Sequence, residues 1–415
     1  MSDALLLHNI AELATLAGGP RRGRDAMNDL GILRDAAVLI EDGVIEEVGP
    51  SDELLRSAPS GAVKLNCGGR AVVPGFIDAH THAVYAGDRV DEFALKLQGA
   101  KYADILAAGG GILHTVRLTR EATRAELLKQ LMARLSTMME YGTTTCEVKS
   151  GYGLDLETEK RLLQVIREAD ERHPMDLVAT FLGAHAVPPE FDDSKSYAEH
   201  VARDMVPEVA ELAEFIDVFC EKGVFTPDES RLILEAGAQE GMRVKVHADE
   251  LALSGGSMVA AELAAVSADH LLHAGPAERA ALAEADVACV LLPCTALSLH
   301  APYADARALI DADALVALAT DHNPNCPTES MPFAMSLACH GMRMTPAEAL
   351  TAATVNAAAA VGRDDRGSIE PGMVGDLVVL DAPSYRYIPY RFGMNPVWKV
   401  VKLGEVVVDW SGRRR

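Results

Sequence analysis

Short apolar runs alternate with amphipathic helical patterns through the middle of the chain, and this alternation restricts the folds open to it. Patterns typical of helices, such as those at 121–140 and 156–172, separate most of the runs. The eight runs have the continuous apolar character of strands buried on both faces, and they lie at residues 71–80, 143–148, 177–185, 215–221, 243–250, 267–273, 287–293 and 315–321. This order predicts a (β/α)8 TIM barrel of the α/β class. A doubly wound open sheet is the alternative, but no GxGxxG motif follows the first strand to favour it.

The two ends of the chain have a different, β-rich pattern. Residues 37–49 are typical of a hairpin with Asp42-Gly43 at its turn, and residues 375–381 and 397–409 repeat the pattern. Because chain termini often lie close together, we expect both ends to form one small composite β-sandwich domain; two separate β appendages are the alternative. The expected boundaries are residues 1–67 and 365–415 for the composite domain and 68–364 for the barrel.

Charge and cysteine content narrow the class of protein. The formal net charge of −23 repels nucleic acid and anionic membranes, so we expect neither as a partner. The first residues carry Asp3 and Glu12 and no basic segment, which argues against a signal peptide, and no long uncharged apolar run predicts a membrane helix. Seven scattered cysteines without a CxxC pair indicate reduced thiols and a cytoplasmic location.

Polar side chains collect at the carboxyl ends of the predicted strands. In a barrel these ends form the mouth that carries the active site, so residues far apart in the sequence are expected to converge there. The side chains concerned are His80, His82, Glu147, His185, Glu221, His247, His270 and Asp321. No single strand end is informative, but their coincidence predicts a functional site.

The pair His80 and His82 is two positions apart on a strand, so both imidazoles are expected to point the same way. At a barrel mouth such a pair is typical of a metal site. For an isolated HxH pair, two hydrogen-bonded histidines without a metal are the more common arrangement. The surrounding string PGFIDAHTH, residues 74–82, is far more specific than the pair alone.

That string resembles the signature of the amidohydrolase superfamily, and the resemblance extends over most of the chain to the imidazolonepropionase family. The matching segments occur in the family's order and at about its spacing: DAHTHAVYAGDR (78–89), EVKSGYGLDLETE (147–159), TFLGAHAVPPEF (180–191), DVFCEKGVF (217–225), VHADE (246–250), DHLLH (269–273) and TDHNP (320–324). The resemblance implies a metal-dependent TIM-barrel hydrolase with a small β-sandwich domain made from both ends of the chain.

The resemblance also implies one divalent or trivalent metal ion per subunit, zinc or iron. Carried over motif by motif, its ligands are His80, His82, His247 and Asp321. Three neutral imidazoles and one carboxylate suit either metal. Some relatives hold a second metal with a glutamate in the fourth-strand region, and Glu221 keeps that alternative open here.

The implied reaction is hydrolysis of 4-imidazolone-5-propanoate to N-formimidoyl-L-glutamate, the third step of L-histidine degradation. It opens the ring at an amide C–N bond with water activated at the metal. Glu250 matches a catalytic or substrate-binding position, and we expect it to be the general base. His270 is expected to polarise the carbonyl oxygen or relay the proton, whereas His273 has the opposite strand parity and is predicted to be structural or in the loop.

Several positions match residues that contact substrate in the family. Arg89 is expected to pair with the propionate, and Tyr152 and His185 to contact the substrate. Asn323, Asn325 and Cys326 lie on a loop that contacts substrate or product, but here the chain departs from the family. Glycine is usual at position 325 and serine or threonine at 326, so this part of the pocket is not standard.

Two other functions remain open from the sequence. A heterocycle deaminase of the same superfamily would need no partner for a propionate, so Arg89 and Tyr152 argue against it. A non-catalytic metal-binding barrel is the other alternative, and the complete ligand set with a candidate base argues against it. The resemblance further suggests a homodimer acting on a small molecule.

Overall fold

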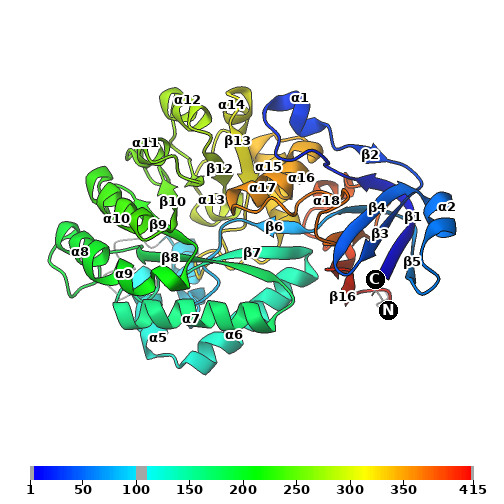
Figure 1. The fold of residues 1–415 in the computed structure, drawn as a ribbon. Coiled ribbons are helices and arrows are strands. Elements are labelled where there is room, and N and C mark those ends of the chain that lie inside the picture. Colours follow the sequence, from blue (N-terminus) through cyan, green and yellow to red (C-terminus); the bar gives the residue numbers. More distant parts are fainter. Residues whose placement is uncertain (1–3, 100–109, 413–415) are drawn as a thin grey trace.

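The computed structural model describes residues 4–99 and 110–412, which form a barrel at one side and a separate sheet at the other (Figure 1). The first described strand, β1, and the last, β16, both belong to that sheet (Figure 1). Among the described residues, no helix has both the length and the apolar character needed to cross a bilayer.

Eight parallel strands form the barrel, in an order that follows the sequence from β6 to β13. They are β6 (Phe76–Asp78), β7 (Thr143–Lys149), β8 (Asp176–Ala184), β9 (Phe215–Cys220), β10 (Arg243–Ala248), β11 (Ser267–His270), β12 (Ala288–Leu291) and β13 (Leu315–Leu318). All eight coincide with the predicted runs, so the predicted barrel is confirmed and the open sheet is not formed.

The ring closes just beyond the ends of its first and last strands. Thr81 and His322 form a parallel bridge, Asp321 N donates to His80 O (3.1 Å) and His82 N donates to His322 O (2.8 Å). The segments that close the barrel are therefore the segments that carry the HxH pair and the strand-eight aspartate.

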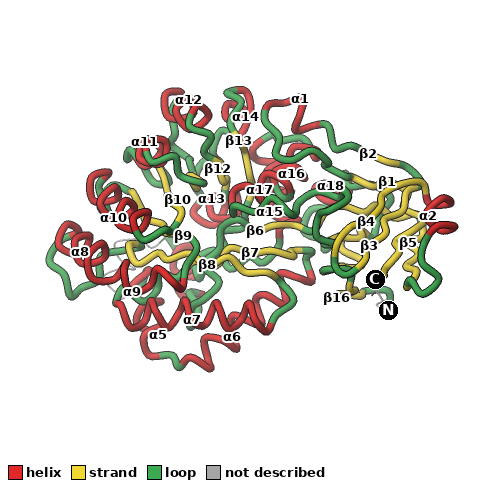
Figure 2. Tube along the Cα trace, viewed as in Figure 1, coloured by secondary structure: helices red, strands yellow, loops and turns green. Residues whose placement is uncertain are grey.

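Helices follow most of the barrel strands and cover the outside of the ring, as Figure 2 shows in red. Three begin with a capping box, in which a threonine and a glutamate three residues later satisfy each other's backbone N–H groups. The helices of the barrel region are α3 (Val90–Leu97), α5 (Ile112–Glu121), α6 (Arg124–Glu140), α7 (Leu156–Arg172), α8 (Ser194–His200), α9 (Val206–Val209), α10 (Pro227–Gln239), α11 (Gly256–Glu262), α12 (Pro276–Glu284), α13 (Pro293–Leu299), α14 (Ala306–Asp311), α15 (Met331–Met342), α16 (Pro346–Ala352) and α17 (Val355–Ala360), with a π-helical turn at Val201–Met205 and a 3-10 turn at Ala210–Leu212.

Both ends of the chain join in one sheet, with the order β16-β15-β14-β5-β1-β3-β4 and β2 paired to β1. The predicted hairpin is formed by β3 and β4, with Asp42 and Gly43 in left-handed conformations at the turn. The elements are β1 (Ala4–Ala14), β2 (Ile32–Leu33), β3 (Ala36–Glu41), β4 (Val44–Pro50), β5 (Val63–Pro74), β14 (Leu377–Leu380), β15 (Val397–Lys402) and β16 (Glu405–Asp409), with α1 (Gly23–Asn28), α2 (Ser51–Ser57) and α18 (Tyr387–Tyr390) beside them.

This sheet joins the N-terminal and C-terminal strands through β14, which pairs antiparallel with β5. Residues from β1, β3, β4, β5, β14 and β15 share one apolar cluster, so the sheet has a core of its own. The domain boundary expected at residue 67 falls inside β5, which stays in this sheet to Pro74. We therefore propose that the barrel unit begins after Pro74.

Candidate metal centre and active site

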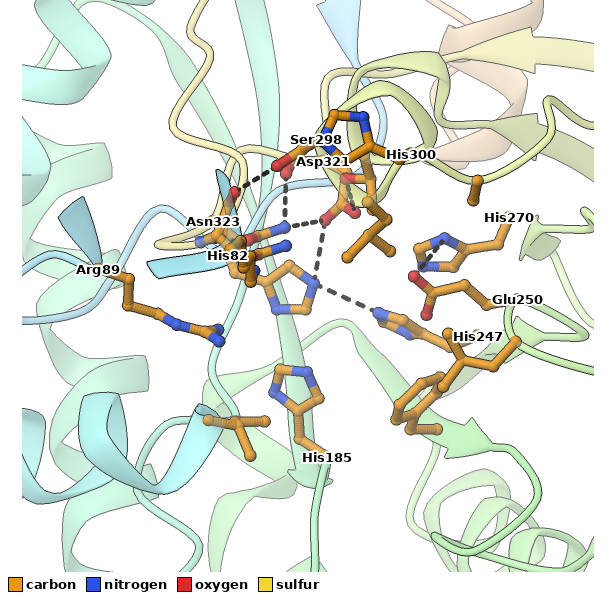
Figure 3. A pocket seen from close by; sticks show the side chains of 18 of the residues that line it. His82, Arg89, His185, His247, Glu250, His270, Ser298, His300, Asp321 and Asn323 are labelled. Carbon is orange, nitrogen blue, oxygen red and sulfur yellow. Dashed lines mark hydrogen bonds and ion pairs between the residues drawn. The ribbon is translucent and has the colours of Figure 1, made fainter. Parts of the chain in front are cut away.

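A cavity of about 710 Å³ opens at the mouth of the barrel, where the polar strand ends meet. Figure 3 shows Arg89 on one side of this cavity and Glu250 with His270 on the other, with His82 and His247 between them. The cavity is lined by His82, Arg89, Lys96, Ile112, Tyr152, His185, Phe219, His247, Glu250, Leu251, His270, His273, Thr295, Ser298, Leu299, His300, Ala301, Pro302, Asp321, Asn323 and Asn325.

The four residues expected to bind metal lie together and are buried. His82 Nε2 is 3.3 Å from His247 Nε2 and 3.5 Å from Asp321 Oδ1, and His80 Nε2 is 3.6 Å from the same oxygen. Two ligands that each lie about 2.0–2.1 Å from a tetrahedral ion are roughly 3.3 Å apart, so these separations fit a shared cation. Among the residues that the structure describes, the buried His80 Nε2 also has no hydrogen-bond partner. The residues therefore fit a zinc or iron ion.

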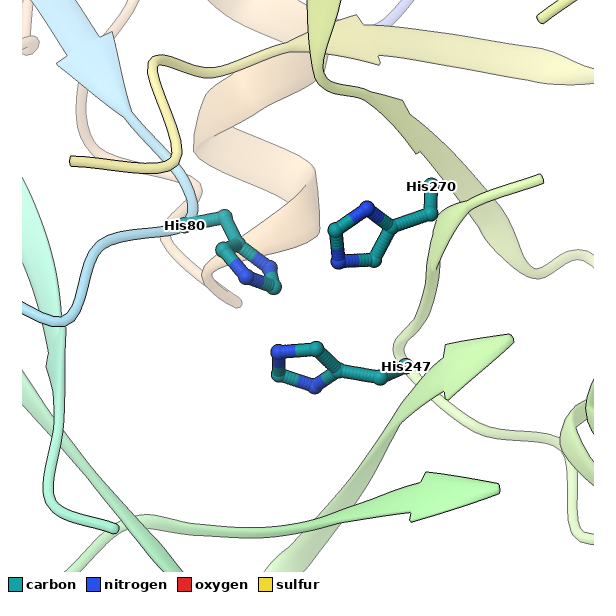
Figure 4. Close-up of side chains that lie close together, drawn as sticks. All are labelled: His80, His247 and His270. Atoms are coloured by element: carbon teal, nitrogen blue, oxygen red, sulfur yellow. The ribbon is translucent and has the colours of Figure 1, made fainter. Parts of the chain in front are cut away.

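A fourth histidine, His270, approaches this group from β11. Ligand atoms of His80, His247 and His270 lie within 4.8 Å of one another, as do those of His80, His82 and Asp321. Figure 4 shows the three rings of the first trio facing a common space. His270 therefore lies close enough either to approach the ion or to act on a molecule bound beside it.

Two buried carboxylates fix the orientation of two of these histidines. His80 Nδ1 is 2.6 Å from Asp269 Oδ2, and His247 Nδ1 is 2.9 Å from Asp217 Oδ2. A carboxylate at Nδ1 holds the proton there and leaves Nε2 free to bind a metal. Both rings thus present Nε2 to the site.

Beneath the histidines lies a layer of buried charges that comes from the inward positions of the barrel strands. Lys149 Nζ is 2.8 Å from Asp217 Oδ2, 2.9 Å from Glu147 Oε2 and 3.6 Å from Asp269 Oδ2. Lys245 Nζ lies 3.0 Å from Glu147 Oε1. Because a buried charge is costly unless it is paired, these lysines stabilise the carboxylates that orient the ligands.

The protonation of the histidines suits metal binding. Burial lowers the pKa of His80 and His82 well below the usual value, and the neighbouring cationic groups lower it further. Neutral imidazole is the form that binds a metal. At His247 burial also lowers the pKa, but Asp217 outweighs it and the pKa is raised.

Asp321 is held in place by its neighbours. Thr295 Oγ1 donates to its Oδ2 at 2.5 Å, and Asn323 Nδ2 donates to its Oδ1 at 3.0 Å. Its backbone has a φ of 52°, a left-handed conformation that is uncommon for aspartate outside turns and functional sites. Burial raises its pKa to about 6.

Glu250 and His270 form a pair on the opposite wall from Arg89. Glu250 Oε1 lies 3.7 Å from His270 Nδ1. Burial raises the pKa of Glu250 to about 8, and the charge of Asp321 raises it in the same direction. His270 has a φ of 79°, which breaks the alternation of β11, so the adjacent Asp269 and His270 both reach the site.

Tyr152 and His185 lie on the next part of the wall. The ring of His185 stacks on that of His82, with centroids 4.9 Å apart. His185 Nδ1 is 3.0 Å from Gly151 O, so Nδ1 carries the proton and Nε2 is an acceptor; burial lowers the pKa of this imidazole to about 3. Burial raises the pKa of Tyr152 well above its usual value, which keeps the phenol neutral.

Arg89 lines the cavity beside the start of α3, but its guanidinium is already paired. Nε and Nη2 donate to Glu92 Oε2 at 2.9 Å and 2.6 Å, and Glu92 also accepts from Gly111 N. The Arg89–Glu92 pair is therefore neutral as a unit.

Of the three residues on the loop after Asp321 that were expected to contact substrate, two line the cavity and one does not. Asn323 and Asn325 line it, whereas Cys326 is buried in a small cluster with Cys294 and Ala334. The Cys326 side chain was expected to contact the substrate, but it does not line the cavity. Its backbone instead closes a turn, because Asn323 Oδ1 accepts from the N–H groups of Asn325 and Cys326.

Three neighbouring residues have other surroundings. Glu221 accepts from the backbone N–H groups of Lys222 and Leu251 and from Ser254 Oγ, so its carboxylate is already used in the loop beside the barrel mouth. His322 is buried away from the cavity, with Nδ1 3.2 Å from Thr328 O. His273 lies on the loop after β11, as expected, yet it lines the cavity.

Sequence reasoning missed the residues that support the ligands. Asp217 and Asp269 orient histidines, Lys149 joins these carboxylates, and Thr295 holds Asp321. Asp217, Asp269 and Lys149 could have been found from the sequence, because each is a charged side chain inside an otherwise apolar strand. Thr295 and Lys96 are on helices and gave no such signal.

An eight-stranded barrel with this set of histidines at its mouth is the arrangement of metal-dependent amidohydrolases, and residues 71–407 match the Amidohydrolase family. Residues 36–60 match the imidazolonepropionase-like composite domain of bacteria. Imidazolonepropionase of Symbiobacterium thermophilum is 50% identical over 99% of both chains, that of Haloarcula marismortui 54% over 90% of both, and that of Geobacillus kaustophilus 49% over 98% of both. The chain therefore belongs to the imidazolonepropionase family of amidohydrolases, as the sequence motifs predicted.

Solved structures share the whole fold at low sequence identity. Guanine deaminase from E. coli superposes with a TM-score of 0.74 at 16% identity, covering 98% of this chain and 99% of that one. An adenosine deaminase from Xanthomonas campestris with bound zinc gives 0.73 at 19% identity, covering 98% and 93%. These likenesses concern the fold.

Proposed function

We propose that this protein hydrolyses 4-imidazolone-5-propanoate to N-formimidoyl-L-glutamate in L-histidine degradation, using one zinc or iron ion. The carrying observation is that one cavity combines a histidine and aspartate cluster, a carboxylate base opposite a guanidinium, and a neutral histidine acceptor. The bond broken is the ring amide C–N bond, and one water molecule is consumed.

The proposed ligands are His80, His82, His247 and Asp321. When bound, the ion supplies Lewis-acid polarisation of the ring carbonyl and lowers the pKa of a bound water. The carboxylates of Asp217 and Asp269 keep the imidazole Nε2 atoms turned toward it.

Glu250 is the proposed general base. Its raised pKa suits a group that accepts a proton from the attacking water and then delivers it to the departing ring nitrogen. His270 lies 3.7 Å from Glu250 and is positioned to donate a hydrogen bond to the carbonyl oxygen or to relay this proton. The new C–O bond forms as the C–N bond breaks, and the proton ends on nitrogen.

The remaining wall would orient the substrate. His185 Nε2 accepts from a ring N–H, and the Tyr152 hydroxyl donates to a substrate heteroatom. Arg89 faces the propionate, and Asn323 and Asn325, which also line the cavity, contact the ligand. Cys326 contributes only through its backbone turn.

A direct assay tests the proposal. Purified protein of known metal content is given 4-imidazolone-5-propanoate, guanine or cytosine, and ring opening or ammonia release is followed. We expect turnover of the imidazolone alone. Ammonia release from guanine or cytosine would favour the deaminase alternative. The fold is compatible with that alternative, because a guanine deaminase has the same fold. No turnover by fully metallated protein would favour a non-catalytic barrel.

We also propose a cytoplasmic location and a homodimer. The location rests on seven scattered free cysteines in a chain of net charge −23. Light scattering on the purified protein tests the dimer, and a monomeric mass across micromolar concentrations would contradict it.

A further inference from the structure

A second cation lies on the same wall of the cavity as Arg89. Lys96, in the last turn of α3, is half-buried and lines the cavity. Its Nζ donates to Asn325 Oδ1, which joins the helix after β6 to the loop after β13. The sequence motifs placed Asn325 on a substrate-contacting loop and gave Lys96 no role.

The charge balance of this wall distinguishes the two cations. The guanidinium of Arg89 is bound to Glu92 through two nitrogens, so its charge is compensated within the protein. Within residues 4–99 and 110–412, no carboxylate lies within ion-pair distance of Lys96, and its hydrogen-bond acceptor is a neutral amide. Among the described residues, Lys96 is thus the cation of this wall that has no ion-pair partner of its own, and the charge of Glu92 offsets only part of the repulsion from Arg89.

Asn325 is a fixed partner for this ammonium. Its backbone N–H donates to Asn323 Oδ1 at 2.8 Å, and its carbonyl oxygen accepts from Ser298 Oγ at 2.7 Å. Since Asn323 also bonds Asp321, the amide that holds Lys96 is tied to the proposed ligand at the end of β13. Asn325, which stands where glycine is usual in the family, thus makes a specific contact with Lys96.

The surroundings of Lys96 also favour binding an anion. Burial lowers its pKa from the ordinary value, and the nearby charge of Arg89 lowers it in the same direction. An anion bound at this wall would stabilise the charged ammonium and so act against this lowering. An ammonium has three donors, so it can keep its bond to Asn325 and donate to a ligand as well.

We propose that Lys96, held by Asn325, is a specificity-determining residue that binds the carboxylate of the substrate. This inference rests on the proposed function, because it assigns the propionate a second partner beside the Arg89–Glu92 pair. The chemistry predicts selectivity for anionic over neutral side chains on the heterocycle, since a charge-assisted hydrogen bond is lost when the ligand is uncharged.

The test uses binding of stable ligands and turnover in parallel. Imidazole-4-propanoate and its uncharged amide are titrated into metallated protein by calorimetry, and KM and kcat are measured with the imidazolone. Lys96→Gln should weaken the carboxylate ligand and raise KM by about 10- to 100-fold, the effect of losing one charge-assisted hydrogen bond. Binding of the amide and kcat should change less than about threefold.

Companion variants separate charge from folding. Lys96→Arg should recover most of the affinity, and Asn325→Asp, which puts a carboxylate against the ammonium, should weaken the propanoate to a similar extent as Lys96→Gln. Exposed Lys129 on α6 is the matched control, and Lys129→Gln should leave all constants unchanged. Thermal melts establish that each variant is folded.

Each outcome has a distinct meaning. Unchanged propanoate affinity and KM in a folded Lys96→Gln protein would overturn the inference while leaving the proposed function intact. Equal weakening of the propanoate and its amide would also overturn it, because the loss would not depend on ligand charge. A wild-type protein that binds both ligands yet does not turn over the imidazolone would instead contradict the proposed function.

Discussion

His80 Nδ1 and Asp269 Oδ2 lie 2.6 Å apart in the fully buried centre of the barrel. The carboxylate fixes the imidazole as the Nδ1–H tautomer and turns Nε2 toward the proposed metal. We predict that Asp269→Asn lowers metal affinity about 10- to 100-fold, the usual effect of removing such a partner. Competition with a chelator of known affinity measures it.

A matched variant controls for the loss of one acidic group. Asp364 is exposed and has no role in the site, so Asp364→Asn should keep wild-type affinity. Wild-type metal affinity in a folded Asp269→Asn protein would show that the carboxylate does not support the ligand.

Metal removal should abolish turnover, because the proposed ligands, which lie just after β6, in β10 and just after β13, hold the ion that supplies the Lewis acid. It should also lower the melting temperature, since a ligand that binds only the folded state stabilises it. Re-addition of zinc or iron is expected to restore both. Full turnover in protein shown by elemental analysis to be metal-free would contradict the mechanism.

Glu250→Gln should lower kcat by about 10²- to 10⁴-fold, because glutamine cannot accept the proton. Burial raises the pKa of Glu250 to about 8, and a bound cation lowers it from there. A base works deprotonated, so wild-type kcat/KM should fall as pH drops through this pKa, at or below pH 8. The variant should lack this limb.

Stopped or continuous assays across pH provide the measurement for Glu250. The exposed Glu284, on α12, gives a control in Glu284→Gln, which should retain the wild-type profile. If Glu250→Gln keeps both kcat and the acidic limb, the base is another residue.

The barrel could be predicted because its strands are buried on both faces and therefore form continuous apolar runs. The place of the site could be predicted because polar side chains stand at the ends of those runs, whereas the proposed ligand set came from the family resemblance. The position of the His270 side chain could not be predicted from the alternation of residues along a strand. Asp269 already occupies the inward position, and only the left-handed backbone at His270 brings its side chain to the site too. No pattern of residue types encodes that conformation.

Contacts between distant segments could not be predicted either. The bond from Lys96 to Asn325 spans 229 positions, and that from Thr295 to Asp321 joins a helix to a strand end. Such pairs depend on how loops are placed over the barrel mouth. The side chain of Cys326 likewise turns to a local apolar cluster rather than to the cavity, a choice made by the turn around Asn323.

Asp176, at the start of β8, links the barrel to the terminal sheet. Its Oδ2 accepts from Lys402 Nζ of β15 at 2.6 Å and from the Arg366 guanidinium. Burial acts to raise its pKa, but Lys402 and Arg366 outweigh it, and the pKa is lowered. A lowered folded-state pKa means that the ionised carboxylate stabilises the fold above the unfolded pKa. This contribution is lost as pH falls through the folded value.

Asp176→Asn should therefore lower the free energy of unfolding at pH 7 by about 1 kcal/mol, a modest figure because the side chain is 39% exposed to solvent. Urea unfolding at pH 7 and near pH 3.5 measures the difference, which should narrow at the lower pH because the Asp176 carboxylate of the unfolded wild-type chain, which has the higher pKa, begins to protonate. Asp364→Asn again serves as the control. An equal deficit at both pH values would mean that the loss comes from packing rather than from the ion pairs that join barrel and sheet.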